Sequence, residues 1–238
     1  MNTTESVDYR ARLAQSLPVV EARIEAAAQA AGRARAEVCL VAVTKAHPIS
    51  ALEAALEMGL HDLGENRVEE LEHKIGILGR AAATWHMIGH LQSRKAGAAA
   101  ALADLVHSVD SSKLAERLSR AAPAGQGPLR VLAQVNASGE AQKSGFSLEA
   151  AVEEIHRLSE LDGLRVDGLM TMAPFVDDEV VLGKTFQRLR ETLEKLRAVT
   201  DKVGAELSMG MTNDLDIAIR EGSTMVRIGT ALFGERIR

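Results

Sequence analysis

Residues 38–45 have the sequence VCLVAVTK, a short valine-rich run that ends in a hydroxyl and an amine. Its length and its β-branched side chains predict a buried strand with Lys45 at the carboxyl end. Similar runs begin near His61, Trp85, Val106, Val131, Val166, Glu206 and Val226. Segments of helical periodicity separate the runs, whose starts lie roughly 20 to 40 residues apart, enough for one strand, one helix and two loops. This alternation predicts an α/β fold, a single-domain TIM-type (β/α)8 barrel.

The segments between the predicted strands carry signals for helices. Ser50 and Glu53 have the spacing of a capping box and Gly59 is a typical helix terminator, which predicts a short helix over 50–58. The chain is also helix-rich ahead of the first strand. We therefore expect residues 1–35 to form an N-terminal helical extension and residues 36–238 to form the barrel.

The composition excludes several classes of protein. The 238 residues include 28 Lys+Arg and 33 Asp+Glu, a net charge of −5, and 46% are hydrophobic, which is typical of a folded chain and not of a disordered one. A mildly acidic chain with few aromatic residues is a poor candidate for binding nucleic acid. We find no secretory signal and no apolar run long enough to span a bilayer, so no membrane association is expected. The lone Cys39 cannot form an internal disulfide, which favours the cytoplasm.

Polar residues gather where the predicted strands end, and in a barrel of this type those ends form the active-site mouth. Lys45 follows a buried run, where an amine with little water around it can lose its proton and attack an aldehyde to form a Schiff base. The alternative is that Lys45 only extends from the end of the barrel into water. The sequence leaves both possibilities open.

The last two predicted strands lead into glycine-containing loops, LSMGMTND at 207–214 and VRIGTALFG at 226–234. Barrels commonly bind phosphate at this place through backbone N–H groups, and Gly210 and Gly229 allow a close approach, while Ser208 and Thr230 add hydroxyls. The alternative is that these glycines are ordinary loop residues. Arg227 is predicted to point into the barrel, where a buried cation needs either a carboxylate such as Asp214 or an acceptor on a ligand.

Other signatures are missing from the chain. The histidines form no HExxH motif or Cys/His cluster, so no metal site is predicted. GxSxG and Walker-type loops are also missing, which argues against a serine hydrolase or an NTPase.

Several strings together resemble one known family. They are VAVTKAHP at 41–48, GENRVEE at 64–70, WHMIGHLQSRKA at 85–96, VHSVDS at 106–111, the loop from Asn136 through Glu140, Lys143 and Gly145, GLMTMAP at 168–174, LSMGMTNDLDIAI at 207–219 and STMVRIGTALFG at 223–234. In this order they resemble the pyridoxal phosphate homeostasis proteins, the YggS/PROSC family. The likeness runs from about residue 10 to the C-terminus.

The resemblance implies a barrel of the alanine racemase N-terminal kind that carries pyridoxal 5′-phosphate (PLP). By the family's motifs, Lys45 is the lysine that forms the aldimine and Arg227 faces the pyridine nitrogen. The phosphate would be held by Ser208, Met209, Gly210, Gly229 and Thr230, and the ring would lie beside Asn66 and Met170. Two positions depart from the pattern: Arg94 stands where the family often has Asn, and Thr212 where it often has Ser.

The resemblance favours a binding protein over an enzyme. A guanidinium on the ring nitrogen keeps the ring neutral and its electron-withdrawing power weak, and Tyr9, the single tyrosine, precedes the barrel, so a two-base racemase is poorly supported. We expect a monomer with no established catalytic residue that stores PLP, supplies it to PLP-dependent apoenzymes and balances amino- and keto-acid pools. A weak racemase or lyase is the alternative, and a phosphate-sugar aldolase that uses Lys45 without PLP is a third possibility.

Overall fold

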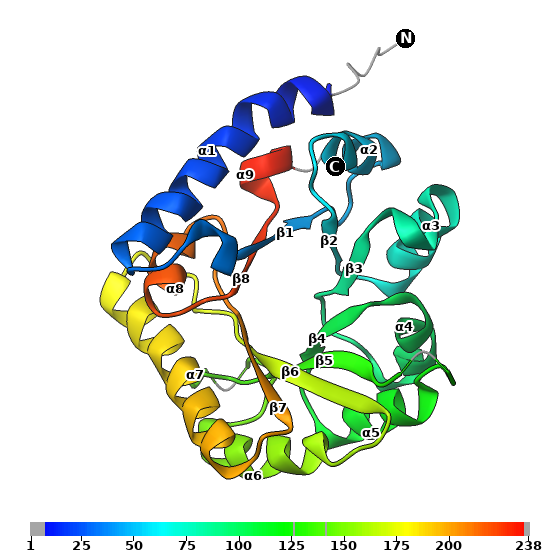
Figure 1. Ribbon diagram of the computed structural model, residues 1–238, viewed down its shortest axis with the longest axis vertical. Helices are drawn as coiled ribbons and strands as arrows, with labels where there is room; N and C mark the ends of the chain where they lie inside the picture. The colour runs from blue at the N-terminus through cyan, green and yellow to red at the C-terminus, as the bar shows by residue number, and fades with distance from the viewer. Residues whose placement is uncertain (1–7, 126, 141, 236–238) are drawn as a thin grey trace.

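The computed structural model describes residues 8–125, 127–140 and 142–235, and these form a closed barrel of eight parallel strands in the order β1 to β8 (Figure 1). The strands are β1 (Cys39–Val43), β2 (Asp62–Glu65), β3 (Thr84–Met87), β4 (Leu105–Val109), β5 (Leu129–Gln134), β6 (Leu164–Met170), β7 (Val203–Ser208) and β8 (Met225–Ile228). The helices include α1 (Tyr9–Ala30), α2 (Ile49–Glu57), α3 (Val68–Leu78), α4 (Ala96–Leu102), α5 (Ser112–Ala121), α6 (Leu148–Ser159), α7 (Glu179–Val199), α8 (Leu215–Arg220) and α9 (Thr230–Phe233). The predicted TIM-type architecture is confirmed.

Strand register decides which side chains face the barrel interior. β1 pairs with both β2 and β8, and Val41 lies opposite Arg227 in that register. Because side chains alternate along a strand, Val41 and Val43 point inward with Arg227, whereas Ala42 points outward with Leu63. The next inward position along β1 is Lys45, just beyond the end of the strand.

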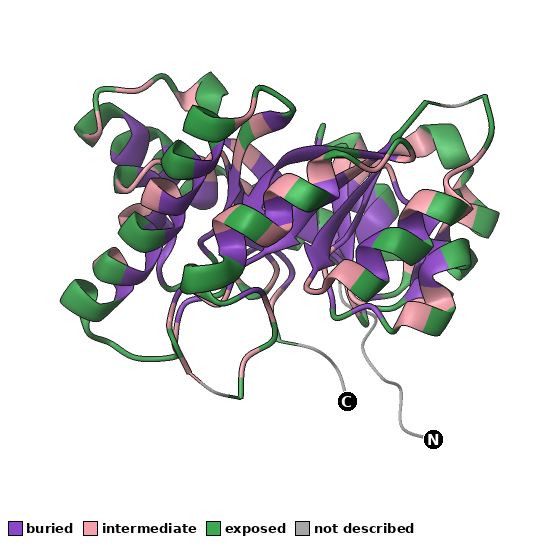
Figure 2. Cartoon of the chain, turned by 90° about the horizontal axis from the view of Figure 1, so that it is seen from below, coloured by how far each residue is buried: buried purple, intermediate pink, exposed green. Residues whose placement is uncertain are grey.

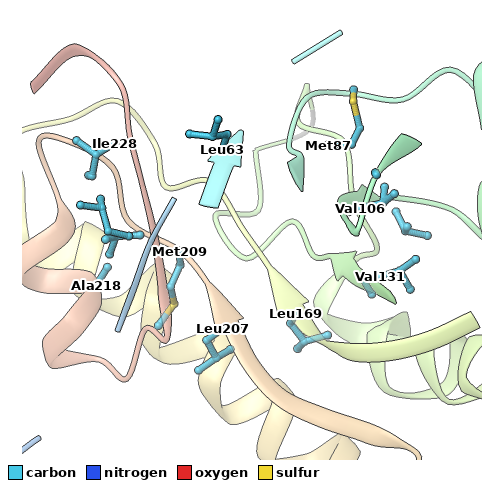
Figure 3. Close-up of a cluster of buried hydrophobic side chains, with 14 of the residues drawn as sticks. Leu63, Met87, Val106, Val131, Leu169, Leu207, Met209, Ala218 and Ile228 are labelled. Carbon is cyan, nitrogen blue, oxygen red and sulfur yellow. The ribbon is translucent and has the colours of Figure 1, made fainter. Parts of the chain in front are cut away.

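Two apolar layers stabilise the barrel. The larger lies between the strands and the surrounding helices, and Figure 3 shows part of it, with Leu63, Val106, Leu169 and Ile228 among the labelled side chains. The smaller is the apolar part of the barrel interior, formed by Leu105, Leu132, Met170 and Met225. Burial is concentrated in the strands and the inner helix faces, while the outer helix faces are exposed (Figure 2).

The N-terminal helix completes the ring of helices. α9, which follows the last strand, is a single turn of four residues and covers little of the barrel. α1 lies against α2, α8 and α9 and buries Leu13, Val20 and Ile24 beneath it (Figure 1). The predicted extension is therefore a structural part of the barrel wall beside β8 and β1. Among the described residues, no helix is both long enough and apolar enough to cross a membrane.

The helix predicted over 50–58 is present, but its predicted cap is wrong. α2 begins at Ile49 after Pro48, and no side chain caps it. Ser50 already lies inside the first turn, because Pro48 holds the extended backbone that precedes the helix. Gly59 ends the helix as predicted, with a φ of 82° that favours glycine.

Candidate functional site

The loops that leave the carboxyl ends of β1, β2, β7 and β8 bring most of the predicted site residues to one mouth of the barrel. Lys45 and Asn66 follow β1 and β2 and are half-buried. Gly210 follows β7, while Gly229 and Thr230 join β8 to α9. The site is therefore built mainly from both ends of the sequence, which meet where β1 pairs with β8.

The backbone on both sides of Lys45 is held by α3. The Lys74 ammonium donates to the Thr44 carbonyl at 2.8 Å, and the Ala46 N–H donates to a carboxylate oxygen of Glu70 at 2.8 Å. Ala46 has a φ of 58°, in the left-handed region that a residue other than glycine rarely adopts. These contacts fix the turn that carries Lys45, so the direction in which its side chain leaves the backbone is set by the fold.

A buried ion pair lies behind this turn. Glu65 is fully buried, and its Oε1 accepts from Lys74 Nζ at 2.6 Å and from the Thr44 hydroxyl at 2.5 Å. Burial raises the pKa of the Glu65 carboxyl, although the Lys74 ammonium and the Thr44 hydroxyl act in the opposite direction. The other oxygen, Oε2, has no hydrogen-bond partner within the described part of the chain. The sequence predicts no role for either residue, because the two charges lie on different elements, β2 and α3, and form no local motif.

Arg227 lies in the barrel interior with 5% of its surface exposed. One terminal nitrogen donates to the carbonyl and the hydroxyl of Ser208 at 2.8 and 2.7 Å, and the other donates to the Thr171 carbonyl at 3.0 Å. Burial lowers its pKa to about 10, a value at which the guanidinium is still charged at neutral pH. Within the described residues its Nε makes no hydrogen bond and no carboxylate lies within 4.0 Å, so Asp214 forms no salt bridge with it, although the charge of Asp214 opposes the effect of burial on the pKa of Arg227.

Asp214 is used elsewhere. Its carboxylate accepts from the Met211 N–H at 2.5 Å and closes the loop between β7 and α8. Burial raises the pKa of this carboxyl, and the hydrogen bond from Met211 is the largest opposing effect. Asp214 therefore fixes the shape of this loop, and the Nε of Arg227 has no hydrogen-bond partner among the described residues.

The hydroxyl of Ser208, which is predicted to bind phosphate, lies beside Arg227. Ser208 is the last residue of β7 and its side chain points into the barrel. Its Oγ contacts Arg227 and lies 2.9 Å from Nδ1 of His107, and the residue has no exposed surface. Strand alternation turns this side chain inward, and the loop that carries Gly210 begins only after this position.

The backbone of the two glycine loops is better placed to bind an anion. Within the described residues, the N–H groups of Gly210, Gly229 and Thr230 donate to no acceptor. A Cβ on Gly229 would lie 3.2 Å from the Val43 carbonyl, so a larger residue would crowd the seam between β8 and β1. Unpaired N–H groups that converge on one place are typical of phosphate sites.

Met209 contributes no donor to this place. Its N–H donates to the Met225 carbonyl at 3.1 Å, and its buried side chain lies in the outer apolar layer near Ala218 (Figure 3). It therefore anchors the start of the loop that presents Gly210.

Asn66 and Met170 lie on different walls of the mouth. A Cβ on Gly89 would come within 2.3 Å of the Asn66 carbonyl oxygen, so the glycine after β3 is what lets the Asn66 backbone take its place. Met170 ends β6 and is buried in the inner apolar layer. The departure at Arg94 takes no part in these contacts: its side chain is exposed and donates to Gln92.

A cavity of about 770 Å³ opens at the opposite end of the barrel, near the start of β3 to β6. Its arginines are already paired, Arg80 with Asp104 and both Arg130 and Arg165 with Asp167. The mouth near Lys45 instead brings together an amine, N–H groups that donate to no acceptor among the described residues, and a guanidinium that forms no salt bridge there.

Comparison with known proteins points to the same family as the sequence strings. Residues 16–237 match the family model described as alanine racemase, N-terminal domain. The pyridoxal phosphate homeostasis protein of Pseudomonas aeruginosa is 45% identical over 224 residues, which cover 94% of this chain and 96% of the relative. The protein of the same name from Escherichia coli K12 is 39% identical over 229 residues, 94% and 97% of the two chains.

Solved structures agree. PipY of Synechococcus elongatus, whose structure was determined with PLP bound, matches with a TM-score of 0.76 at 36% identity, covering 83% of this chain and 93% of PipY. Alanine racemase from Corynebacterium glutamicum shares the fold, with a TM-score of 0.70 at 17% identity over 92% of this chain and 62% of the racemase. By sequence over nearly its whole length, and by fold, the chain belongs to the pyridoxal phosphate homeostasis protein family.

Proposed function

We propose that this protein binds PLP at the mouth near Lys45 and acts in PLP homeostasis as a store and donor of the cofactor. The observation that carries the proposal is the buried guanidinium of Arg227, whose Nε has no hydrogen-bond partner and which forms no salt bridge within the described residues. A neutral acceptor such as a pyridine nitrogen suits that edge. The relationship to PipY, which binds PLP, supports the same conclusion.

The residues present fit the cofactor. In this proposal Gly210, Gly229 and Thr230 bind the phosphate through their N–H groups, and Lys45 supplies the amine that bonds to the aldehyde carbon with loss of water. Asn66 and Met170 line the ring. Two residues that were predicted to bind phosphate take other roles in this proposal. Ser208 accepts a hydrogen bond from Arg227 and holds it in place, and Met209 anchors the start of the loop that presents Gly210.

The same residues favour storage over turnover. PLP supplies an electrophilic aldehyde and a ring that withdraws electrons best when its nitrogen is protonated. Arg227 keeps its charge at neutral pH and opposes a second cation on that nitrogen. A racemase would also need a second base. The single tyrosine, Tyr9, is instead in contact with His47: its hydroxyl lies 3.2 Å from Nδ1 of that ring, on the α1 side of the loop after β1.

Compartment and assembly are also part of the proposal. The thiol of Cys39 lies in the barrel wall, where burial raises its pKa to about 12, so it is a poor nucleophile and suits a reducing cytoplasm. We propose a monomer that gives PLP to apoenzymes. Sedimentation of the loaded protein and transfer of PLP to an apo-transaminase across a dialysis membrane would test both statements.

The first experiment is an absorbance spectrum of the purified protein with added PLP, followed by borohydride reduction and peptide mapping. We expect a visible band and a reduced pyridoxyl group on Lys45. A protein that shows no visible band after excess PLP has been added and the unbound PLP removed would overturn the proposal. Sustained racemisation or elimination of one amino acid by the loaded protein would establish the enzyme alternative.

A further inference from the structure

A continuous chain of hydrogen bonds crosses the barrel interior beneath the proposed ring site. It starts at Arg227, whose NH1 lies 2.7 Å from Ser208 Oγ. Ser208 Oγ lies 2.9 Å from His107 Nδ1, His107 Nε2 lies 2.9 Å from His86 Nδ1, and His86 Nε2 lies 3.0 Å from Asp62 Oδ1. The first four members are at most 5% exposed. The chain therefore links β8 to β2 through side chains of β7, β4 and β3.

The chemistry of its two ends gives the chain one direction. A guanidinium can only donate, so Ser208 Oγ accepts from Arg227 and its own proton goes to Nδ1 of His107. His107 then carries its proton on Nε2 and donates to Nδ1 of His86. His86 in turn carries its proton on Nε2 and donates to the Asp62 carboxylate. Every group in this arrangement is satisfied.

The opposite arrangement is worse at both ends. If His107 donated from Nδ1 to Ser208, the serine proton would have no acceptor within the described residues. A neutral His86 would then turn a bare nitrogen toward the Asp62 carboxylate, and two acceptors would face each other. The reverse direction becomes favourable only when His86 is doubly protonated.

The charges around His107 support its neutral form. Its ring is fully buried, and it faces His86 on β3, Arg130 on β5 and Arg227 on β8. Burial lowers the pKa of this ring well below its usual range, and the positive groups lower it further. His107 therefore has one proton, which can sit on either nitrogen and so can follow the direction of the chain.

Asp62 is the member that meets solvent, with 37% of its side chain exposed. Three groups face it: His86 on β3, Cys39 on β1 and His61 at the start of β2. The hydrogen bond from His86 is the largest of the effects that lower the pKa of the Asp62 carboxyl. A proton taken up at this end changes the charge at Asp62, and the hydrogen bonds of the two histidines and Ser208 connect that change to Arg227.

We propose that His86 and His107 are positioning residues that couple the carboxylate of Asp62 to the edge of Arg227 that faces the cofactor. In the forward direction the serine hydroxyl presents only lone pairs to the guanidinium, which holds Arg227 in place beneath the ring nitrogen. If the hydrogen bonds reverse direction, the hydroxyl proton of Ser208 has no acceptor within the described residues and lies beside the Arg227 cation. This inference rests on the proposed function in one respect only, that PLP is the ligand above Arg227.

The first test needs no cofactor. In protein with 15N-labelled histidine rings, long-range 1H–15N NMR at neutral pH should show His86 and His107 as neutral rings protonated on Nε2. A coupling across the N–H···N hydrogen bond should join Nδ1 of His86 to Nε2 of His107. Single substitutions at the two positions assign the signals. A proton on Nδ1 of His107 would overturn the stated direction.

The second test follows PLP binding in variants across a pH series. In H107F the serine loses its acceptor, and we expect the Kd for PLP to rise about three- to ten-fold, the range for one lost neutral hydrogen bond. D62N keeps an acceptor for His86 but removes the charge, and we expect the pH midpoint of the bound-cofactor absorbance to move by roughly half a unit with little change in Kd. H61Q, beside Asp62 but outside the chain, is the matched control.

The two failures can be told apart. Unaltered protein that does not bind PLP contradicts the proposed function, whereas the NMR result still decides whether the chain exists and which way it runs. PLP binding with the same Kd and pH midpoint in H107F, D62N and the unaltered protein would contradict the coupling. If H107F does not fold, D62N at the half-exposed end gives the decisive pH profile.

Discussion

The Tyr9 hydroxyl lies 3.2 Å from Nδ1 of His47, and through this contact the first turn of α1 is joined to the loop that carries Lys45. The two rings meet edge to face, and Phe233 of α9 lies against both. The single tyrosine thus has a buried structural position, and burial raises its pKa. Y9F should leave PLP binding within about two-fold and lower the free energy of unfolding by about 1 kcal/mol, the typical contribution of one hydrogen bond. Urea unfolding and a PLP titration measure the two, and abolished PLP binding would contradict the structural role.

Replacement of Lys45 should separate covalent from noncovalent binding. In K45A the amine is gone, whereas the N–H groups of Gly210, Gly229 and Thr230 remain, so PLP should bind without the Schiff-base band and should be removed by dialysis. K95A is the matched control, because Lys95 is near the mouth but paired with Glu69. Complete loss of PLP binding in K45A would mean that the phosphate site alone is too weak to hold the ligand.

Removal of the ammonium behind the Lys45 turn should be costly. K74M leaves Glu65 buried without its counter-ion and releases the Thr44 carbonyl, and we expect the free energy of unfolding to fall by about 3 to 5 kcal/mol. Lys202, whose ion pair with Glu160 is half-exposed, provides the control, since K202M should change stability little. Equal effects of the two substitutions in chemical denaturation would refute the importance of the buried pair.

The glycine loop after β7 should not tolerate a side chain. Gly210 has a φ of 97°, and a Cβ there would lie 2.6 Å from the Ala218 Cβ, so G210A should destabilise by about 1 to 3 kcal/mol and weaken PLP binding. Gly183 inside α7 has ordinary space around it, with the nearest atom 3.9 Å away. G183A should stabilise by about 0.5 to 1 kcal/mol through helix propensity. Thermal unfolding of the G210A and G183A variants measures both effects on stability. A G210A variant as stable as the unaltered protein would show that the loop can move to accept a side chain.

Stability should depend on pH through His107. Its pKa is lowered in the folded protein, so the unfolded chain binds the extra proton and the stabilisation that is present above about pH 6.5 is lost as the pH falls. The slope from this one group can reach about 1.4 kcal/mol per pH unit. Urea unfolding of the unaltered protein and of H107F between pH 7 and 5 isolates it by difference. Parallel curves for the two proteins would exclude this linkage.

The fold was readable from the sequence because each strand is a short apolar run that stands out between helices. The starts predicted near Trp85, Val106 and Val166 lie within two residues of β3, β4 and β6. In contrast, β7 begins three residues before Glu206, where Gly204 and Ala205 give a weak strand signal. The capping box at Ser50 failed because a neighbouring proline decided where the helix begins.

The site was only partly readable. Lys45 and Arg227 could be predicted because each is a charged residue next to or within an apolar run. The pairings that position them, Glu65 with Lys74 and His86 with His107, join residues on different elements, and no local spacing reveals them. The contact between Ser208 and Arg227 depends on strand register, which a sequence pattern specifies only to within one residue.

The seam between β1 and β8 has a consequence for synthesis on the ribosome. Residues 39–43 emerge long before residues 225–228, yet they must pair to close the barrel, and α1 must pack on α8 and α9. Until then one edge of β1 has no strand beside it, and an open, apolar edge invites pairing with other chains. Barrel closure and completion of the ligand mouth are therefore the same late event, so a nascent chain cannot hold its ligand before its final strand has been made.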